Sequence, residues 1–178
     1  MTEWEKMQTG QIYNDFDEDL FNRRVAAKKL FKEFNRTDDC ETDRRREIMC
    51  KLFKKVGANV WIEPDFRCEF GGNITIGDNT LIGPNVGIYN ASHVIDAGER
   101  IAGGLIPDSI RIGNRVWIGG NVVLVSGASI GDDTVVGAGS VVVGDIPSGV
   151  VAAGNPCRVI RKITDKDKTG FAPEKHSR

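Results

Sequence analysis

The sequence predicts a mainly β protein: a solenoid of stacked parallel strands, preceded by a small helical segment. A six-residue pattern runs through two blocks of the chain, residues 74–91 and 110–145, and gives nine consecutive or near-consecutive words. The third position of every word is a large aliphatic residue, and glycine follows it directly in six of the nine. The composition agrees, because 21 glycines and only 7% aromatic residues suit a fold of many tight turns more than one large aromatic core.

The six-residue period decides between helix and strand. An α-helix would spread residues of this spacing over three faces, whereas a short strand followed by a tight turn places all of them inside. Three words then make one triangular coil. Stacked coils bury the recurring aliphatics on the central axis, which no coil could do alone. These residues are Ile76, Ile82, Ile88, Ile112, Ile118, Leu124, Ile130, Val136 and Val142.

An eighteen-residue unit contains the shorter one. The two words of the second block without the glycine read Leu124-Val125 and Val142-Val143, which lie 18 residues apart. The alternative is a meander of β-strands with glycine turns, and nine matching words disfavour it.

Residues 1–57 follow a different pattern and predict a helical segment. They are rich in charge and in Leu, Phe and Met, and apolar residues recur at helical spacing within Asp17–Phe34. Thr42 or Asp43 would cap a second helix that Gly57 ends. Its apolar side would carry Ile48, Met49, Leu52 and Phe53.

The solenoid is expected to span residues 58–163 and to be interrupted once. Residues 92–109 contain Gly and Pro but do not continue the six-residue pattern, which predicts a loop that projects from the coils. Long loops in a solenoid of otherwise short turns are usually functional or disordered. The last segment, 164–178, is polar and is expected to be a loose tail.

Charge and cysteine usage exclude several functions. The chain has 24 Lys and Arg against 25 Asp and Glu, so its net charge gives no reason to bind nucleic acid or an anionic membrane. No apolar run is long enough to span a bilayer, and the N-terminus does not resemble a signal peptide. Four scattered cysteines and two histidines give no metal-ligand spacing. We therefore expect a cytoplasmic protein with free thiols and no metal.

Five stretches carry a resemblance to a known family: EKMQTGQIYN, IEPDFRCEFGGN, IYNASHVID, IRIGNRVWIGGNVVL and AAGNPCRVIRKI. Together they cover nearly the whole chain. The sequence resembles the hexapeptide-repeat acetyltransferases, and among them the maltose and galactoside O-acetyltransferase group. The resemblance implies a homotrimer of left-handed parallel β-helices, with acetyl-CoA in the groove between neighbouring subunits. It also implies that the acetyl acceptor is a hydroxyl, typically of a sugar.

His93 is the candidate catalytic residue. Acyl transfer from a thioester to an alcohol needs a base of near-neutral pKa to accept the hydroxyl proton. A lone loop histidine is ordinarily a surface residue, but His93 matches the position of the family's catalytic histidine. The other histidine, His176, is expected to be inert.

The resemblance implies six cofactor-binding residues: Trp117, Gly119, Gly120, Ala138, Arg158 and Arg161. The tryptophan would lie near the thioester, with packing on the coil exterior as the alternative. Backbone N–H groups at the two glycines are candidate donors to the oxyanion. The alanine matches a backbone contact to the cofactor. The arginines would meet the nucleotide end of CoA, for which a guanidinium is well suited, or would be solvated charges.

Asp15, Arg24 and Glu69 match positions that contact the acceptor sugar, although charged residues of a helical segment are often simply solvated. The sequence also departs from the family twice. Relatives have about twenty more residues between Asn73 and His93, roughly one coil, which contribute to the acceptor site. Val143-Gly144 replaces a Thr-Lys pair common in the cofactor groove.

Alternatives to sugar acetylation remain open on the sequence alone. The chain could be a weakly active or non-catalytic CoA-binding scaffold, for which the shorter solenoid is the main argument. It could also acetylate a non-sugar hydroxyl, such as that of an antibiotic. A hydratase of the carbonic anhydrase type is disfavoured, because it would need about three histidine ligands to zinc.

Overall fold

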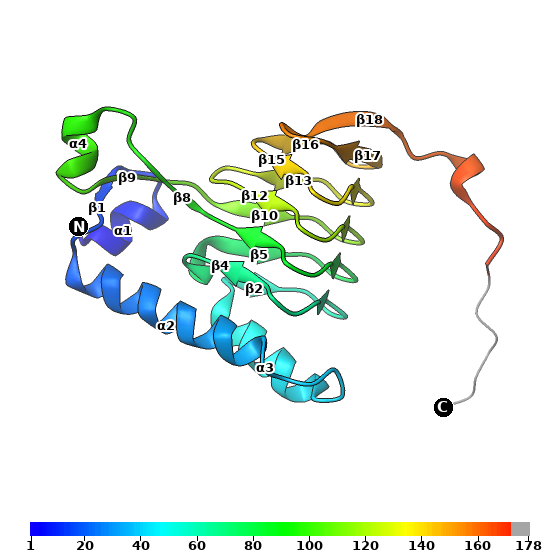
Figure 1. Ribbon diagram of the computed structural model, residues 1–178, viewed down its shortest axis with the longest axis horizontal. Coiled ribbons are helices and arrows are strands. Elements are labelled where there is room, and N and C mark those ends of the chain that lie inside the picture. Colours follow the sequence, from blue (N-terminus) through cyan, green and yellow to red (C-terminus); the bar gives the residue numbers. More distant parts are fainter. Residues whose placement is uncertain (172–178) are drawn as a thin grey trace.

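Three sheets, parallel except for the last strand of one of them, form the sides of a stack of coils in the computed structural model, which describes residues 1–171 (Figure 1). Within each uninterrupted run of coils, three consecutive strands enter the three different sheets, and the next strand returns to the first sheet. Side 1 contains β2 (Lys55–Val56), β5 (Ile74–Ile76), β10 (Ile110–Ile112), β13 (Ser129–Ile130) and β16 (Asp145–Ile146). Side 2 contains β3 (Trp61–Ile62), β6 (Leu81–Ile82), β11 (Trp117–Ile118), β14 (Val135–Val136), β17 (Val150–Ala153) and β18 (Arg158–Lys162). Side 3 contains β4 (Arg67–Cys68), β7 (Gly87–Ile88), β12 (Val123–Leu124) and β15 (Val141–Val142).

The aliphatic residues at the third position of each word face the inside of the stack. Parallel pairing places each of them directly on its counterpart in the next coil, as in Ile76, Ile112 and Ile130 of side 1. All nine predicted positions are buried and belong to one hydrophobic cluster. Each such side chain contributes about 1.5–3 kcal/mol to folding.

One coil precedes those visible in the repeat. It is built from β2, β3 and β4, and its inward residues are Val56, Ile62 and Cys68. The coil stack therefore starts at Lys55, three residues before the composition changes. Only one of these three residues, Val56, is followed by glycine, which is why the repeat pattern does not reveal this coil.

The fourth and sixth positions of each six-residue word have different backbone requirements. The fourth position holds glycine because adjacent coils approach closely there. A Cβ on Gly77, for example, would lie 2.5 Å from the carbonyl carbon of Gly113. Positive φ occurs instead at the sixth position, mostly at Asn, Asp or Gly, as at Asn79, Asn121 and Asp133, and also at Arg115.

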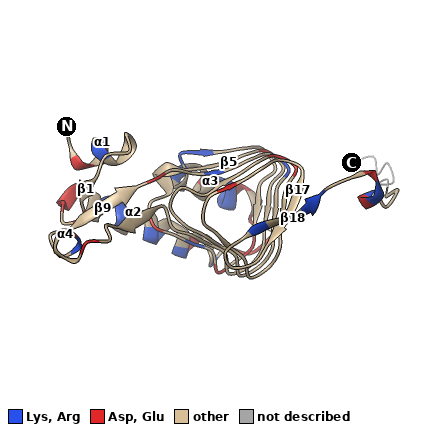
Figure 2. Ribbon diagram, turned by 90° about the horizontal axis from the view of Figure 1, so that it is seen from above, with Lys and Arg blue, Asp and Glu red and all other residues tan. Residues whose placement is uncertain are grey.

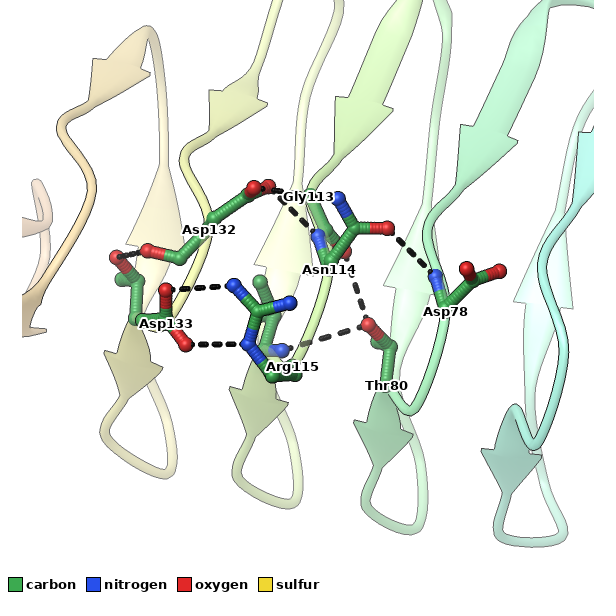
Figure 3. Close-up of polar contacts among 9 residues, drawn as sticks. Asp78, Thr80, Gly113, Asn114, Arg115, Asp132 and Asp133 are labelled. Atoms are coloured by element: carbon green, nitrogen blue, oxygen red, sulfur yellow. Dashed lines mark hydrogen bonds and ion pairs between the residues drawn. The ribbon is translucent and has the colours of Figure 1, made fainter.

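A ladder of polar side chains joins the coils at the corner between sides 1 and 2 (Figure 3). The side chain of Asp78 accepts the N–H of Ala58 (2.8 Å), and that of Asn114 accepts the N–H of Asp78 (2.9 Å). Asp132 in turn accepts the N–H of Asn114 (2.8 Å). Each corner amide therefore has a partner in the neighbouring coil.

Helices α1 (Glu3–Gln8), α2 (Glu18–Phe34) and α3 (Thr42–Leu52) form the N-terminal segment. Helix α2 lies where the apolar spacing predicts it, with Asp17 as N-cap. The predicted ends of the second helix were wrong: Glu41 occupies the N-cap of α3 without a side-chain bond, and the helix stops at Leu52. The backbone then enters β2, so Gly57 lies inside the first coil.

The interruption of the repeat has its own secondary structure. It contains β8 (Ala91–His93), α4 (Ala97–Ile101) and β9 (Gly104–Pro107), and β9 lies between β8 and the N-terminal strand β1 (Tyr13–Asn14) in an antiparallel sheet. We call β8, α4 and β9 the hairpin segment. In Figure 2 it and β18 project on opposite sides of the coils. The short 3-10 helices are η1 (Gly71–Asn73) and η2 (Asp165–Asp167).

Residues 172–178, which include His176 and part of the predicted tail, lie outside the described residues. Within residues 1–171, no helix combines the length and apolar character needed to cross a membrane.

Candidate active site

His93 lies at the end of β8 and is exposed to solvent. Strand pairing places His93 opposite Leu105, and Leu105 opposite Tyr13. Leu105 and Tyr13 are 4% and 2% exposed and belong to a small hydrophobic cluster with Met7, Leu20 and Phe70. The histidine is therefore fixed by an ordered sheet that the N-terminal segment anchors.

The three residues matched to acceptor binding lie around one buried tyrosine. Arg24 forms an ion pair with Asp15 at 2.7 Å, and both side chains are 20% exposed or less. Burial raises the pKa of Tyr13, and the nearby carboxylates of Asp15 and Glu69 raise it further. The Tyr13 hydroxyl has no hydrogen-bond partner among the described residues, so a buried neutral donor stands beside these charges.

A hydrogen bond joins the residue directly before the hairpin segment to the residue directly after Glu69. Asn90, which is fully buried, accepts the N–H of Phe70 at 3.2 Å. Glu69 and the start of the histidine-bearing strand are thus held together. Sequence reasoning missed Tyr13, although its place two residues before Asp15 was a signal that could have found it.

Trp117 lies on the outer face of side 2 and is 55% exposed. Strand register places it between Leu81 of β6 and Val135 of β14. Leu81 is also 50% exposed, so an apolar strip runs across this sheet.

Gly119, Gly120 and Ala138 form the corner beyond Trp117. The N–H of Gly119 donates to the carbonyl of Val136 (2.8 Å) and is not available to a ligand. Gly120 donates no hydrogen bond to any described residue, so it is the candidate oxyanion donor of the two. A Cβ on Gly119 would lie 2.6 Å from the backbone nitrogen of Ala138, which requires glycine at this point.

The two arginines lie on β18, which is exposed along its length. Arg158 donates to the carbonyl of Cys157 (2.8 Å). Arg161 holds Asp167 through two bonds of 2.7 and 2.8 Å, which lowers the pKa of this carboxyl to about 2. A ligand phosphate would have to compete with Asp167 for Arg161, whereas Arg158 has no carboxylate partner in the part of the chain described.

The site residues fall into two groups on one chain. One group comprises His93, Tyr13 and the charges around it, and the other lies along side 2 from Trp117 to β18. No hydrogen bond or ion pair within residues 1–171 joins the hairpin segment to side 2. No cluster of three or more His, Cys, Asp or Glu side chains in the same range is arranged to hold a metal.

Two family models match the chain. The maltose acetyltransferase hexapeptide capping motif covers residues 6–57, and the bacterial transferase hexapeptide repeat covers residues 53–90 and 109–144. The capping match coincides with the helical segment, and the repeat match with the coils on both sides of the hairpin segment.

Named relatives extend over most of the chain. A galactoside O-acetyltransferase of Escherichia coli is 40% identical over 184 positions, which cover 92% of this chain and 91% of the relative. A maltose O-acetyltransferase structure from Clostridium difficile has a TM-score of 0.79 and 43% identity, covering 93% of this chain and 99% of its own. A galactoside acetyltransferase solved in complex with coenzyme A has a TM-score of 0.79 and 40% identity, with 94% of both chains covered.

The alignment also measures how much shorter this chain is. Since 92% of 178 residues is about 164, the 184 aligned positions include about 20 at which this chain has no residue. That number is close to one coil of eighteen residues. The two family models, the relatives and the shared structure together place this chain in the hexapeptide-repeat acetyltransferases, within the maltose and galactoside O-acetyltransferase group.

Proposed function

We propose that the protein transfers an acetyl group from acetyl-CoA to a hydroxyl of a sugar or a similar small acceptor, with His93 as general base. The observation that carries this proposal is the position of His93. It is exposed at the end of an ordered strand, in register with Tyr13 and next to the anchoring region of Asp15, Arg24 and Glu69. Carboxylate, guanidinium and phenol groups together supply the donors and acceptors that a polyhydroxyl compound needs.

The chemistry requires one proton to move twice. His93 accepts the proton of the acceptor hydroxyl as its oxygen attacks the thioester carbon. The N–H of Gly120 would stabilise the resulting oxyanion. Collapse of the tetrahedral intermediate breaks the carbon–sulfur bond, and the imidazolium returns the proton to the CoA thiolate. The products are the acetyl ester and CoA, and no covalent enzyme intermediate is needed.

The residues on side 2 fit acetyl-CoA as the second substrate. Trp117 offers an exposed aromatic surface for the thioester end, the corner near Gly120 and Ala138 offers backbone contacts, and Arg158 offers a cation for a phosphate. The solved relative bound to coenzyme A supports this assignment.

A homotrimer of left-handed coils is part of the proposal. The His93 group and the Trp117 group are separate on one chain, so a second copy would be needed to bring an imidazole to the thioester. Exposed apolar residues on β18, such as Val159 and Ile160, supply a surface for such contacts. A cytoplasmic location remains a prediction, consistent with the four free cysteines.

A scaffold that binds CoA without turnover is the second candidate, and the roughly 20 absent positions favour it. Acetylation of a non-sugar hydroxyl differs only in the acceptor.

Release of the CoA thiol from acetyl-CoA, measured with a panel of sugars and other alcohols, separates these candidates. The proposal predicts release that depends on a sugar acceptor, with the acetyl ester identified by mass spectrometry. CoA binding without release on any acceptor would favour the scaffold, and release with non-sugar alcohols alone would reassign the acceptor.

A further inference from the structure

The outer face of side 2 carries one continuous row of side chains in strand register. From β18 to β3 the row is Arg161, Val151, Val135, Trp117, Leu81 and Trp61. No coil intervenes between Trp61 and Leu81, because β3 pairs directly with β6. Neighbouring strands are about 4.8 Å apart, so Trp61 lies roughly 9.6 Å along the row from Trp117.

The two ends of this row have different proposed roles. The proposed cofactor contacts extend along side 2 from β18, which carries Arg158 for the nucleotide end, to Trp117 at the thioester end. Beyond the thioester end the row continues over Leu81 to Trp61, and this side of the row is left uncovered by the proposed cofactor contacts. This part of the row therefore lies on the acceptor side of the reacting atoms.

Trp61 and Glu63 have the chemistry that sugars need. The indole N–H of Trp61 donates to one oxygen of Glu63 at 2.7 Å, which orients the carboxylate. The other oxygen of Glu63 accepts no bond from the residues described. Both side chains are partly exposed. An aromatic ring covers the C–H face of a pyranose, and an oriented carboxylate accepts hydrogen bonds from its hydroxyls.

A pocket continues from Trp61 towards α3. Its volume is about 330 Å³, near the lower end of the range for small-molecule sites. Thr42, Asp43, Arg46 and Asn59 contribute polar groups to its wall. The Arg45 guanidinium lies 4.8 Å from the centre of the Trp61 ring and supports it from the protein side.

We propose that Trp61 and Glu63 form a second acceptor subsite, which binds the ring of a glycoside or disaccharide that is not acetylated. The proposal rests on the function above and deepens it: the ring that reacts lies near Trp117 and Leu81, and the next ring stacks on Trp61. The preferred acceptor is then a two-ring sugar, because a single ring cannot reach both positions.

Calorimetric titration of the full-length protein, saturated with CoA, tests the subsite with maltose and methyl α-glucoside as probes. The wild-type protein should bind maltose at least about tenfold more tightly. Glu63→Gln should weaken maltose binding by about tenfold, the loss expected for a hydrogen bond to a charged group, and leave methyl α-glucoside unchanged. Trp61→Phe retains an aromatic ring next to Arg45 and should reduce the same preference.

Asp145→Asn is the matched control, since Asp145 is an exposed carboxylate on side 1. It should bind both sugars as the wild-type protein does. Equal wild-type affinity for the two sugars, or a preference that survives both variants, would overturn the subsite. Sugar-dependent acetyl release by a protein with no such preference would leave the proposed function intact. A preference without any release would instead retain the subsite and reject the function.

Discussion

At the scale of single residues, Tyr13 is the least expected member of the site. Its side chain is 2% exposed, and its hydroxyl has no partner among the described residues. A buried polar group without a partner costs about 1–3 kcal/mol. Such a cost is tolerated where a ligand supplies the missing bond, and Asp15, Arg24 and Glu69 surround this hydroxyl.

Tyr13→Phe should therefore stabilise the free protein and weaken the complex. Removing the hydroxyl relieves an unsatisfied group, so the free energy of unfolding should rise by about 1 kcal/mol. The KM for the acceptor should increase severalfold, while the KM for acetyl-CoA should not change. Thermal unfolding and steady-state kinetics measure the two effects, and a destabilised variant with an unchanged acceptor KM would refute this role.

At the scale of elements, the close approach of neighbouring coils, and not a positive φ, explains why the fourth position of a word is so often glycine. Gly77 has an ordinary φ, but a Cβ there would lie 2.5 Å from Gly113 and 2.6 Å from the backbone nitrogen of Asn114. Gly144 also lacks a positive φ, and a Cβ there would meet no atom of the described residues within 4 Å. These two glycines allow a matched comparison.

Gly77→Ala should lower the free energy of unfolding by about 1–3 kcal/mol, because neighbouring backbone must move. Gly144→Ala should be neutral or stabilise the protein by up to about 1 kcal/mol, since it only restricts the unfolded chain. Denaturant titration of both variants measures the difference. Equal effects of the two substitutions would show that coil contact does not govern the glycine pattern.

The polar ladder of Figure 3 makes stability depend on pH. Bonds from the backbone and side chain of Asn114 lower the pKa of Asp132. A lowered folded-state pKa stabilises the folded protein above the unfolded value of about 3.9 and loses that effect as pH falls. The melting temperature should drop on acidification from about pH 5 to 3, and by less in Asp132→Asn. Identical slopes in the two proteins would exclude a contribution from this bond.

The sequence predicts these elements to different extents. The coils were predictable because the inward residues are large aliphatics at a fixed spacing, as Ile118 and Val136 illustrate. The first coil was not, because Ile62 and Cys68 are followed by Glu63 and Glu69 and not by the glycine that marks a word. The strands of the hairpin segment were also missed, because they lack the six-residue pattern and β9 is completed by pairing with β1, about ninety residues earlier in the chain. His93 and the arginines remain predictions from resemblance, whereas the place of Trp61 in the row on side 2 needed strand register.

At the scale of the whole molecule, the proposed active site requires more than one copy of the chain. His93 projects with the hairpin segment, and Trp117 lies on side 2, with no hydrogen bond or ion pair joining the two regions within residues 1–171. We propose that a catalytic site which uses both takes them from different subunits.

Mixed oligomers test this requirement. His93→Ala and Trp117→Ala chains, each much less active alone, should regain activity when they are co-expressed with different tags and purified as mixed oligomers. Some interfaces in such oligomers combine an intact His93 with an intact Trp117. Mixed oligomers that form but regain no activity would contradict a shared site, and a monomeric wild-type protein in solution would do so as well.

The rate of acetyl transfer in His93→Ala tests the role of this histidine most directly. A general base typically contributes about 10²–10⁴-fold, so kcat should fall by that factor while the affinity for CoA is retained. Ser92→Ala, a change at the adjacent exposed position of β8, should keep nearly full activity. A His93→Ala protein that folds, binds CoA and transfers acetyl at the wild-type rate would contradict general-base catalysis by His93.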